Sequence, residues 1–330
     1  MKESEYIPGF DWMRIFGSIL VVVSHFNVFD QAIADHLLAS RMLSVVVPVF
    51  FIMSGFLCSR GFSKERVFRQ VIKYGAIFLA IQFFLVFWVH ASAYARSGQG
   101  TISGLGIDLL KALFFRHYYA RQLWFIPALL YPMLLNAFLD SSWKRRIVIG
   151  IAAAFYLFIQ TVGAVSILQF LETYMASNPS VAKFFTPAEL NRILLHFATG
   201  LLFTTIGFDI GTWKTTPIHL LVAAVPVVLF EVYVRFIGVT PILLSILFYE
   251  GIKRIPGTWM YPYHFEISVF SGAMYFLHFF GIILIKKYIS MNPLIGIPLI
   301  IATNILITVA ASCFVRRRRA RANIDMNHGL

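Results

Sequence analysis

Charged residues are scarce in this chain of 330 residues. Asp, Glu, Lys and Arg make up 13% of it, about half the share that a soluble domain carries. Hydrophobic residues make up 59%, and the mean hydropathy is +0.77. Apolar runs of about 20 residues, long enough to cross a hydrocarbon core about 30 Å thick, recur along the whole length. The pattern predicts an all-α fold, a polytopic transmembrane helical bundle.

Cysteine is also scarce. Cys58 and Cys313 are the two cysteines, and both fall inside apolar segments, so a disulfide framework is not expected. Cys58 is interpreted as a small packing residue. Glu3 and Glu5 precede the first apolar run, which lacks a small-residue cleavage site. We therefore expect a retained first span rather than a signal peptide.

The apolar runs predict about ten spans. They are 10–30, 43–59, 74–95, 122–140, 145–164, 191–208, 217–236, 239–250, 264–285 and 293–315. The eighth is short, and Pro241 near its start and Gly251 after it predict a half-span or a broken helix. Residues 1–315 are expected to form one transmembrane domain, followed by a short basic cytoplasmic tail at 316–330.

Negative charge is the rarer sign, with 15 Asp and Glu against 28 Lys and Arg. Threading ten spans with both termini inside places 17 of those 28 cations in inner segments. Because cytoplasmic loops of membrane proteins are enriched in Lys and Arg, we expect both termini in the cytoplasm. The basic tail is interpreted as an anchor against anionic lipid headgroups, not as a nucleic-acid arm. We expect membrane lipids as partners and no nucleic acid.

The first span nevertheless holds three ionisable residues, in the stretch GFDWMRIFGSILVVVSH. Asp11 and Arg14 are three residues apart and share a helix face, where they can pair. His25 lies eleven residues after Arg14, about three turns or about 16 Å along the same face. Ionisable groups within spans mark functional sites by default, so the stripe favours a polar path. The alternative is that Asp11 and Arg14 only reach the inner interface and that His25 caps the outer end.

A basic stretch, SKERVFRQVIKY, follows the second span. If it is helical, Arg66 and Arg69 share one face. Guanidinium groups suit bidentate recognition of phosphate. The alternative is that these cations only set the topology.

Several motifs, taken together and in order, resemble the acyltransferase type 3 family of integral membrane acyltransferases. Asp11, Arg14 and His25 match its opening signature, and VPVFFIMSGFL resembles its second-span motif. Arg66 and Arg69 match its Arg-x-x-Arg loop. RQLWFIPALL, which contains Trp124, and AMYFLHFFGI, which contains Tyr275 and His278, are similar to two later elements.

Two features depart from the family pattern or add nothing to it. WMYPYHFEI places His264 and Glu266 at the ninth span, where the pattern has no counterpart for them. The middle of the chain, from about 140 to 255, contributes only hydropathy to the resemblance. His196 and Glu231 are ionisable residues in this middle part without a role that the sequence supports. No appended esterase-like domain is apparent.

The resemblance implies transfer of an acyl group, usually acetyl, from cytoplasmic acyl-coenzyme A to a hydroxyl of an extracytoplasmic or lipid-linked saccharide. Such O-acetylation would modify a polysaccharide from the bacterial cytoplasmic (inner) membrane. Acetyl-coenzyme A or another acyl-coenzyme A is the expected donor, and no metal is expected.

The resemblance also implies roles for the matched residues. His25 suits a general base, although a transient acyl-histidine stays open. Arg14 is expected to bind donor phosphate, to stabilise an oxyanion or to pair with Asp11, which would orient it. Arg66 and Arg69 would dock the polyanionic donor.

Saccharide contacts are expected from Trp124, and secondarily from Tyr275 and His278. The segment Gly104 to Trp124 reads as an interfacial helix on the outer side, whose aromatic residues form either a sugar platform or an aromatic belt.

Two other function classes fit the same ingredients. A transporter or flippase for a saccharide or acyl-group carrier would use the polar residues of the spans as a gate and a proton relay. A non-catalytic assembly factor of a polysaccharide machine would use none of them in chemistry. Turnover of acyl-coenzyme A separates the enzyme from both.

Overall fold

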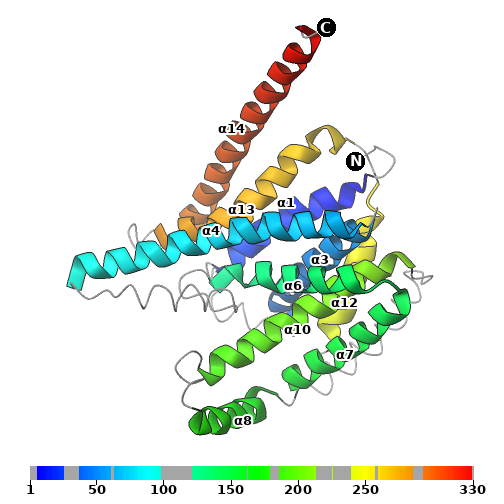
Figure 1. Cartoon of the computed structure of the whole chain (residues 1–330), viewed down its shortest axis with the longest axis vertical. Helices are drawn as coiled ribbons and strands as arrows, with labels where there is room; N and C mark the ends of the chain where they lie inside the picture. Colours follow the sequence, from blue (N-terminus) through cyan, green and yellow to red (C-terminus); the bar gives the residue numbers. More distant parts are fainter. Residues whose placement is uncertain are drawn as a thin grey trace. The chain divides into compact units, whose positions relative to one another are not determined.

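The computed structural model of this chain is helical throughout the parts that it describes, and these parts contain no strand. The described residues are 6–25, 37–60, 63–97, 121–161, 163–178, 186–212, 225, 239–256, 259–284 and 293–328. Figure 1 shows the helices. The α-helices are α1 (Pro8–His25), α3 (Leu37–Ser59), α4 (Lys64–Ser97), α6 (Phe125–Phe138), α7 (Ser142–Thr161), α8 (Gly163–Ser177), α10 (Pro187–Asp209), α12 (Thr240–Lys253), α13 (His264–Leu284) and α14 (Pro293–His328). Short 3₁₀ turns are η2 (Arg121–Trp124), η3 (Ile210–Thr212) and η4 (Tyr261–Tyr263).

The all-α prediction is confirmed, and a helix coincides with each predicted span except 217–236, which lies outside the described residues apart from Val225. Three bounds differ from the prediction. α4 begins at Lys64, so the basic stretch before residue 74 is the first part of a 34-residue helix. α8 has no predicted counterpart, and α14 continues past residue 316 to His328. The number of spans and the side of each terminus stay predictions.

Two helices are long and apolar enough to cross a membrane, Lys64–Trp88 within α4 and Gly296–Val315 within α14. Shorter apolar helices occupy Val45–Ser59 and Phe125–Phe138. α12, the predicted half-span, has 14 residues, fewer than the approximately 20 that cross a hydrocarbon core.

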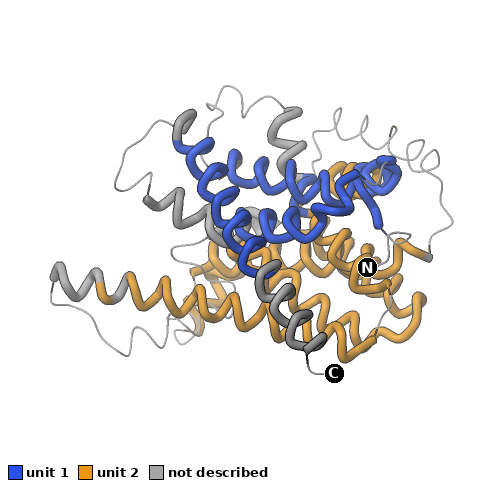
Figure 2. The backbone as a smooth tube through the Cα atoms, turned by 90° about the horizontal axis from the view of Figure 1, so that it is seen from above, with its two compact units in different colours: residues 1–47, 248–330 blue, residues 48–247 orange. Residues whose placement is uncertain are grey.

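The chain divides into two compact units, drawn in two colours in Figure 2. Unit 1 comprises residues 1–47 and 248–330, and unit 2 comprises residues 48–247. Each is described by itself below.

In unit 2, the helices alternate in direction. Gly200 of α10 packs on Ala128 of α6, and Thr205 of α10 contacts Asn136 of α6, so these two helices run parallel. On α4 and α6, by contrast, Lys64 lies over the Phe138 ring and Gly75 meets Leu130, so the two helices are antiparallel. A chain that passes back and forth through one layer produces this alternation.

Glycine permits the closest helix contacts of unit 2. A Cβ atom at Gly200 of α10 would collide with the backbone carbonyl of Ala128 of α6. Asn136 of α6 then donates from Nδ2 to the Thr205 hydroxyl of α10 at 2.9 Å, where both side chains are buried. Small residues at a helix interface allow this approach, as they do in membrane-helix packing.

A buried carboxylate fastens the end of α10 to the start of α7. Asp209 is fully buried, accepts a hydrogen bond from the Ser142 hydroxyl and forms an ion pair with Arg146 at 3.2 Å. The Arg146 side chain is largely exposed, so it carries the paired charge to the edge of the unit. This arrangement explains the buried acid structurally.

In unit 1, α1 and α13 lie side by side and run parallel. Asp11 contacts His264, and seven residues further along both helices Ser18 contacts Ser271 at 2.9 Å. Val22 and Met274 then pack together with Ile300 of α14 in one buried cluster. The predicted first and ninth spans are both odd-numbered, so a parallel pair is the arrangement that ten crossings require.

Candidate active site

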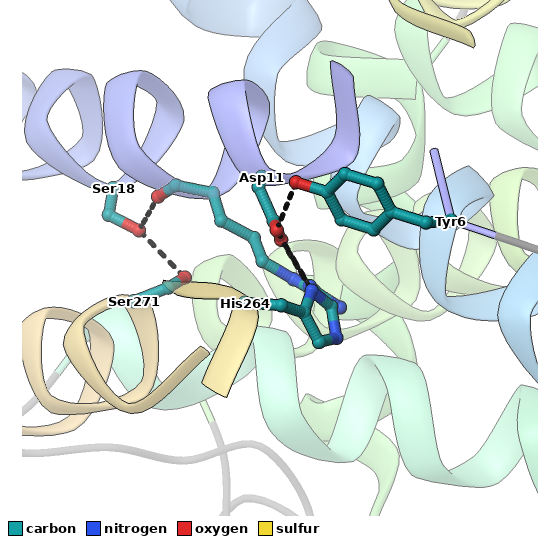
Figure 3. A network of polar contacts seen from close by, with 6 residues as sticks. Tyr6, Asp11, Ser18, His264 and Ser271 are labelled. Atoms are coloured by element: carbon teal, nitrogen blue, oxygen red, sulfur yellow. Dashed lines mark hydrogen bonds and ion pairs between the residues drawn. The ribbon is translucent and has the colours of Figure 1, made fainter. Parts of the chain in front are cut away.

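The polar centre of unit 1 is the carboxylate of Asp11, which is fully buried. Three side chains surround it (Figure 3). The Tyr6 hydroxyl donates to Oδ2 at 2.9 Å, and Arg14 Nη1 donates to Oδ1 at 2.7 Å. His264 Nδ1 lies 2.8 Å from Oδ2 and 3.0 Å from Oδ1. We call Tyr6, Asp11, Arg14 and His264 the Asp11 network.

The local sequence explains how α1 presents this carboxylate. α1 begins at Pro8, whose fixed φ suits a first helical turn. Asp11 therefore lies in the first turn, where the helix dipole stabilises a negative charge. A Cβ at Gly9 would collide with the Ile252 carbonyl at the end of α12, so only glycine allows the backbone to approach there.

A pair of serines continues the polar contact between α1 and α13. The Ser18 hydroxyl donates to the backbone carbonyl of Arg14 and meets the Ser271 hydroxyl (Figure 3). Ser18 is buried. The polar face of α1 therefore extends from the first turn towards the middle of the helix.

Charge and tautomer within the Asp11 network follow from its geometry. An ionised carboxylate only accepts hydrogen bonds, so His264 must donate through Nδ1–H. Its Nε2 is then the nitrogen that does not face Asp11. Arg14 Nη1 also lies 3.4 Å from His264 Nδ1, so one cation and one imidazole share the same anion. With a neutral imidazole, Asp11 and Arg14 cancel and the network carries no net charge.

Tyr6 keeps its proton at neutral pH. Burial, followed by the hydrogen bond to Asp11, raises the pKa of its phenol. The Tyr6 hydroxyl is therefore a donor and does not compete with Asp11 as an anion.

Aromatic rings pack next to the network. Tyr6 contacts the rings of Tyr261 and His264 edge-on, with centroids 5.2 Å and 5.7 Å away. Trp12 stacks on Phe16 and meets Trp259 edge-on. The network is not sealed, however, because the Arg14 side chain is 19% exposed and that of His264 is 31% exposed. A buried anion with two partly exposed basic partners can receive a ligand from one side.

The predicted ion pair of Asp11 and Arg14 is present. α1 ends at His25, so positions 14 and 25 belong to one continuous helix, but the His25 side chain lies outside the described part of the chain. The same holds for the side chains of Tyr275 and His278, which are positions of α13. The roles of all five residues stay predictions.

The remaining predicted site residues belong to unit 2. Arg66 and Arg69 lie near the start of α4 and are both exposed, and their spacing is helical as predicted. Arg66 donates to the Arg60 carbonyl at 3.2 Å. The Trp124 ring is stacked on His196, with centroids 4.0 Å apart and planes 15° apart. One face of Trp124 is thus covered by His196, and the rings of Phe51 and Phe125 also lie beside it.

Sequence reasoning did not connect Tyr6 or His264 to the site. His264 stood out as an ionisable residue that begins an apolar span. Its partner lies 253 residues earlier in the chain, and only tertiary structure brings the two together. Among the described residues, no group of three His, Cys, Asp or Glu side chains could hold a metal ion.

Comparison with known proteins gives the family of the chain. A family model described as an acyltransferase domain matches residues 7–315, nearly the whole chain. No curated protein and no solved structure matches the chain. The match includes Asp11, Arg14 and His264 of the Asp11 network, α4 and the stretches whose motifs resemble the family. The chain therefore belongs to the acyltransferase type 3 family, which supports an acyltransferase activity.

Proposed function

We propose that this chain is a membrane O-acyltransferase of the bacterial cytoplasmic membrane. It transfers an acyl group, acetyl in the simplest case, from cytoplasmic acyl-coenzyme A to a hydroxyl of an extracytoplasmic or lipid-linked saccharide. The hydroxyl oxygen bonds to the thioester carbonyl carbon, the carbon–sulfur bond breaks, and coenzyme A leaves as a thiol. His25 takes the hydroxyl proton, which solvent returns to the sulfur.

Exposed apolar faces support the membrane location. α4 exposes Phe83, Phe84, Phe87 and Trp88, each about half-exposed, on one stretch of the helix. α14 exposes Ile305, Leu306, Val309 and Phe314. Contiguous apolar surface of this kind marks contact with lipid or with another protein. Two helices of spanning length carry these faces, which favours lipid.

The observation that carries the proposal is the Asp11–Arg14 ion pair of the family signature, held at the contact between α1 and α13. A fully buried carboxylate is retained there with three donors. Buried ionisable groups of membrane helices serve function by default. α1 continues from this pair to His25, the residue proposed as the base.

The direct test measures thiol release from acetyl-coenzyme A in membranes of a deletion strain that is complemented with the chain. These membranes contain the natural acceptor, whatever its identity. We expect His25→Ala to lower the rate by about 10²–10⁴-fold, the usual contribution of a general base. Size-exclusion elution and the melting temperature in detergent check that the variant folds.

Thiol release that persists in His25→Ala would refute the role of that residue. Proton-coupled uptake of a saccharide without turnover of coenzyme A would favour a transporter instead. A glycan mass that is unchanged between the deletion strain and its parent would contradict the acceptor class.

Donor docking by Arg66 and Arg69 has its own test with a matched control. Both side chains are exposed near the start of α4, and Lys73 is an exposed cation further along the same helix. We expect Arg66→Ala and Arg69→Ala each to raise KM for acetyl-coenzyme A about tenfold, the effect of losing a charged hydrogen bond. Lys73→Ala should leave KM unchanged. Equal effects of all three substitutions would indicate a general electrostatic attraction and no phosphate dock.

A further inference from the structure

His264 has a place in the site that neither the motifs nor the proposed function assign to it. It is the first residue of α13, its Nδ1 is bound to Asp11, and its ring is 31% exposed. Arg14 Nη1 lies 3.4 Å from the same Nδ1, and the Arg14 side chain is 19% exposed. Two basic side chains are therefore held next to each other and reach the surface of unit 1.

Distance along α1 decides what His264 can contact. His264 packs on the first turn of α1, and His25 is the last residue of that helix. Residues 14 and 25 are separated by about 16 Å along the helix axis. One thioester carbonyl cannot touch groups at both levels. If the acyl transfer takes place at His25, His264 contacts a part of the donor remote from the sulfur.

Coenzyme A has such a remote part. Its extended pantetheine arm separates the sulfur from the diphosphate by a length comparable to the distance between the two levels of α1. A diphosphate is an anion that guanidinium and imidazolium groups bind through charged hydrogen bonds.

We propose that Arg14 and His264, both held by Asp11, bind the diphosphate of acyl-coenzyme A while the thioester reaches the level of His25. This inference rests on the proposed function and adds His264 to the donor site. Asp11 acts as the positioning residue, because it fixes Nδ1 and turns Nε2 away from itself.

Binding in this way is consistent with the charges around the ring. The neutral Nδ1–H tautomer has no proton on Nε2, so His264 takes up one proton from solvent when it donates to a phosphate oxygen. The imidazolium then lies between two anions, Asp11 and the phosphate, which stabilise its positive charge. The neighbouring cation, Arg14, repels this charge. The other groups nearby are Tyr6, which donates to Asp11, and Glu266 on the same helix. In the bound state the Asp11 network has two positive charges, on Arg14 and the imidazolium, against the one negative charge of Asp11, and the phosphate balances the excess.

The test measures binding of coenzyme A by calorimetry to the purified full chain in phosphatidylcholine nanodiscs, which contain no competing anionic lipid. His264→Asn keeps a donor at the position of Nδ1 towards Asp11 but lacks Nε2. We expect it to weaken binding of coenzyme A at least about tenfold and to retain kcat at saturating acetyl-coenzyme A in complemented membranes. Inorganic pyrophosphate should compete with coenzyme A in the parent chain and compete less well in His264→Asn.

Two further variants separate binding from folding. His264→Gln keeps a donor near the position of Nε2 and should regain part of the affinity. Tyr263→Phe changes the exposed neighbouring residue of η4 and should leave binding unchanged.

Unchanged affinity in His264→Asn would overturn the inference. So would a loss of kcat at unchanged affinity, since it would assign His264 to proton transfer. If anionic lipid displaces coenzyme A from the parent chain and pyrophosphate does not, the site binds lipid headgroups and the inference is wrong. A parent chain that binds coenzyme A but releases no thiol would refute the proposed function and leave the binding site intact.

Discussion

At the scale of single residues, burial of Asp11 is the unusual feature of the chain. An isolated carboxylate in an apolar interior is strongly destabilising, whereas a carboxylate with several charged or polar donors is tolerated. Asp11 has Tyr6, Arg14 and His264 as donors. The contribution of Asp11 to stability thus depends on these three partners, and each partner in turn depends on Asp11 for its orientation.

Removal of this carboxylate should destabilise the chain. Asp11→Ala leaves Arg14 and His264 without their shared anion, and breaking a buried ion pair from one side costs about 3 kcal/mol or more. Thermal unfolding in detergent, followed by tryptophan fluorescence, measures the loss. The matched control is Asp140→Ala, which removes an exposed acid paired with Lys144 at 2.8 Å. Exposed pairs contribute little, so its melting temperature should not change. Equal shifts for both variants would contradict the special role of burial.

The two ion-pair partners of Asp11 differ in how far the sequence reveals them. Arg14 follows at a spacing of three, which any helix converts into a contact. His264 becomes a partner only because α1 and α13 pack in parallel and in register. A single sequence states the period of a helix but not which helices are neighbours. His264, which has no place in the family pattern, therefore stood out in the sequence, but its partner Asp11 could not be predicted.

At the scale of elements, capping residues determine where helices begin, and these residues lie before the apolar runs that predict the spans. Ser63 accepts a hydrogen bond from the Arg66 amide at 3.1 Å at the start of α4. Thr186 and Glu189 form a capping box before α10. Both helices begin before the apolar run, because caps and charged first turns belong to the helix but not to the span. α8 was missed for a related reason: its 15 residues are too few for a span.

Helix contacts in unit 2 should be sensitive to a single methyl group. Gly200→Ala would force α10 away from the backbone of α6 at Ala128. Overpacking of this kind destabilises by about 1–3 kcal/mol. Gly150→Ala in α7 is the control, since no atom lies within 4 Å of its added Cβ. Within a helix the control should stabilise by about 0.5–1 kcal/mol, because alanine loses less backbone entropy than glycine. Unfolding in detergent compares the two, and the same sign for both would contradict the close approach.

At the scale of the whole molecule, helix direction is the feature that relates the fold to a membrane. Within unit 2, α6 runs parallel to α10, and α4 runs antiparallel to α6. α7 begins beside the end of α10 and so runs against it. The predicted spans 122–140 and 191–208 are both even-numbered, and 74–95 and 145–164 are both odd-numbered, so these directions agree with the predicted order of crossings. The directions alone do not state which side is the cytoplasm.

Labelling of single cysteines tests that orientation within unit 2. Cys58 and Cys313 are first replaced by serine, and a cysteine is then placed at Lys144 or at Ser177, which are both exposed. Lys144 belongs to the basic start of α7, expected inside by the distribution of cations. Ser177 ends α8, which follows α7 and is expected outside. A membrane-impermeant maleimide should label Ser177→Cys in intact spheroplasts and Lys144→Cys only after lysis. α7 and α8 separate the two positions, and the 15 residues of α8 are too few for a span. Labelling of both positions in intact cells would therefore mean that α7 does not cross the membrane. The reverse pattern would place the basic segments outside. Arg66 and Arg69 would then lie on the side of the membrane that cytoplasmic acyl-coenzyme A does not reach.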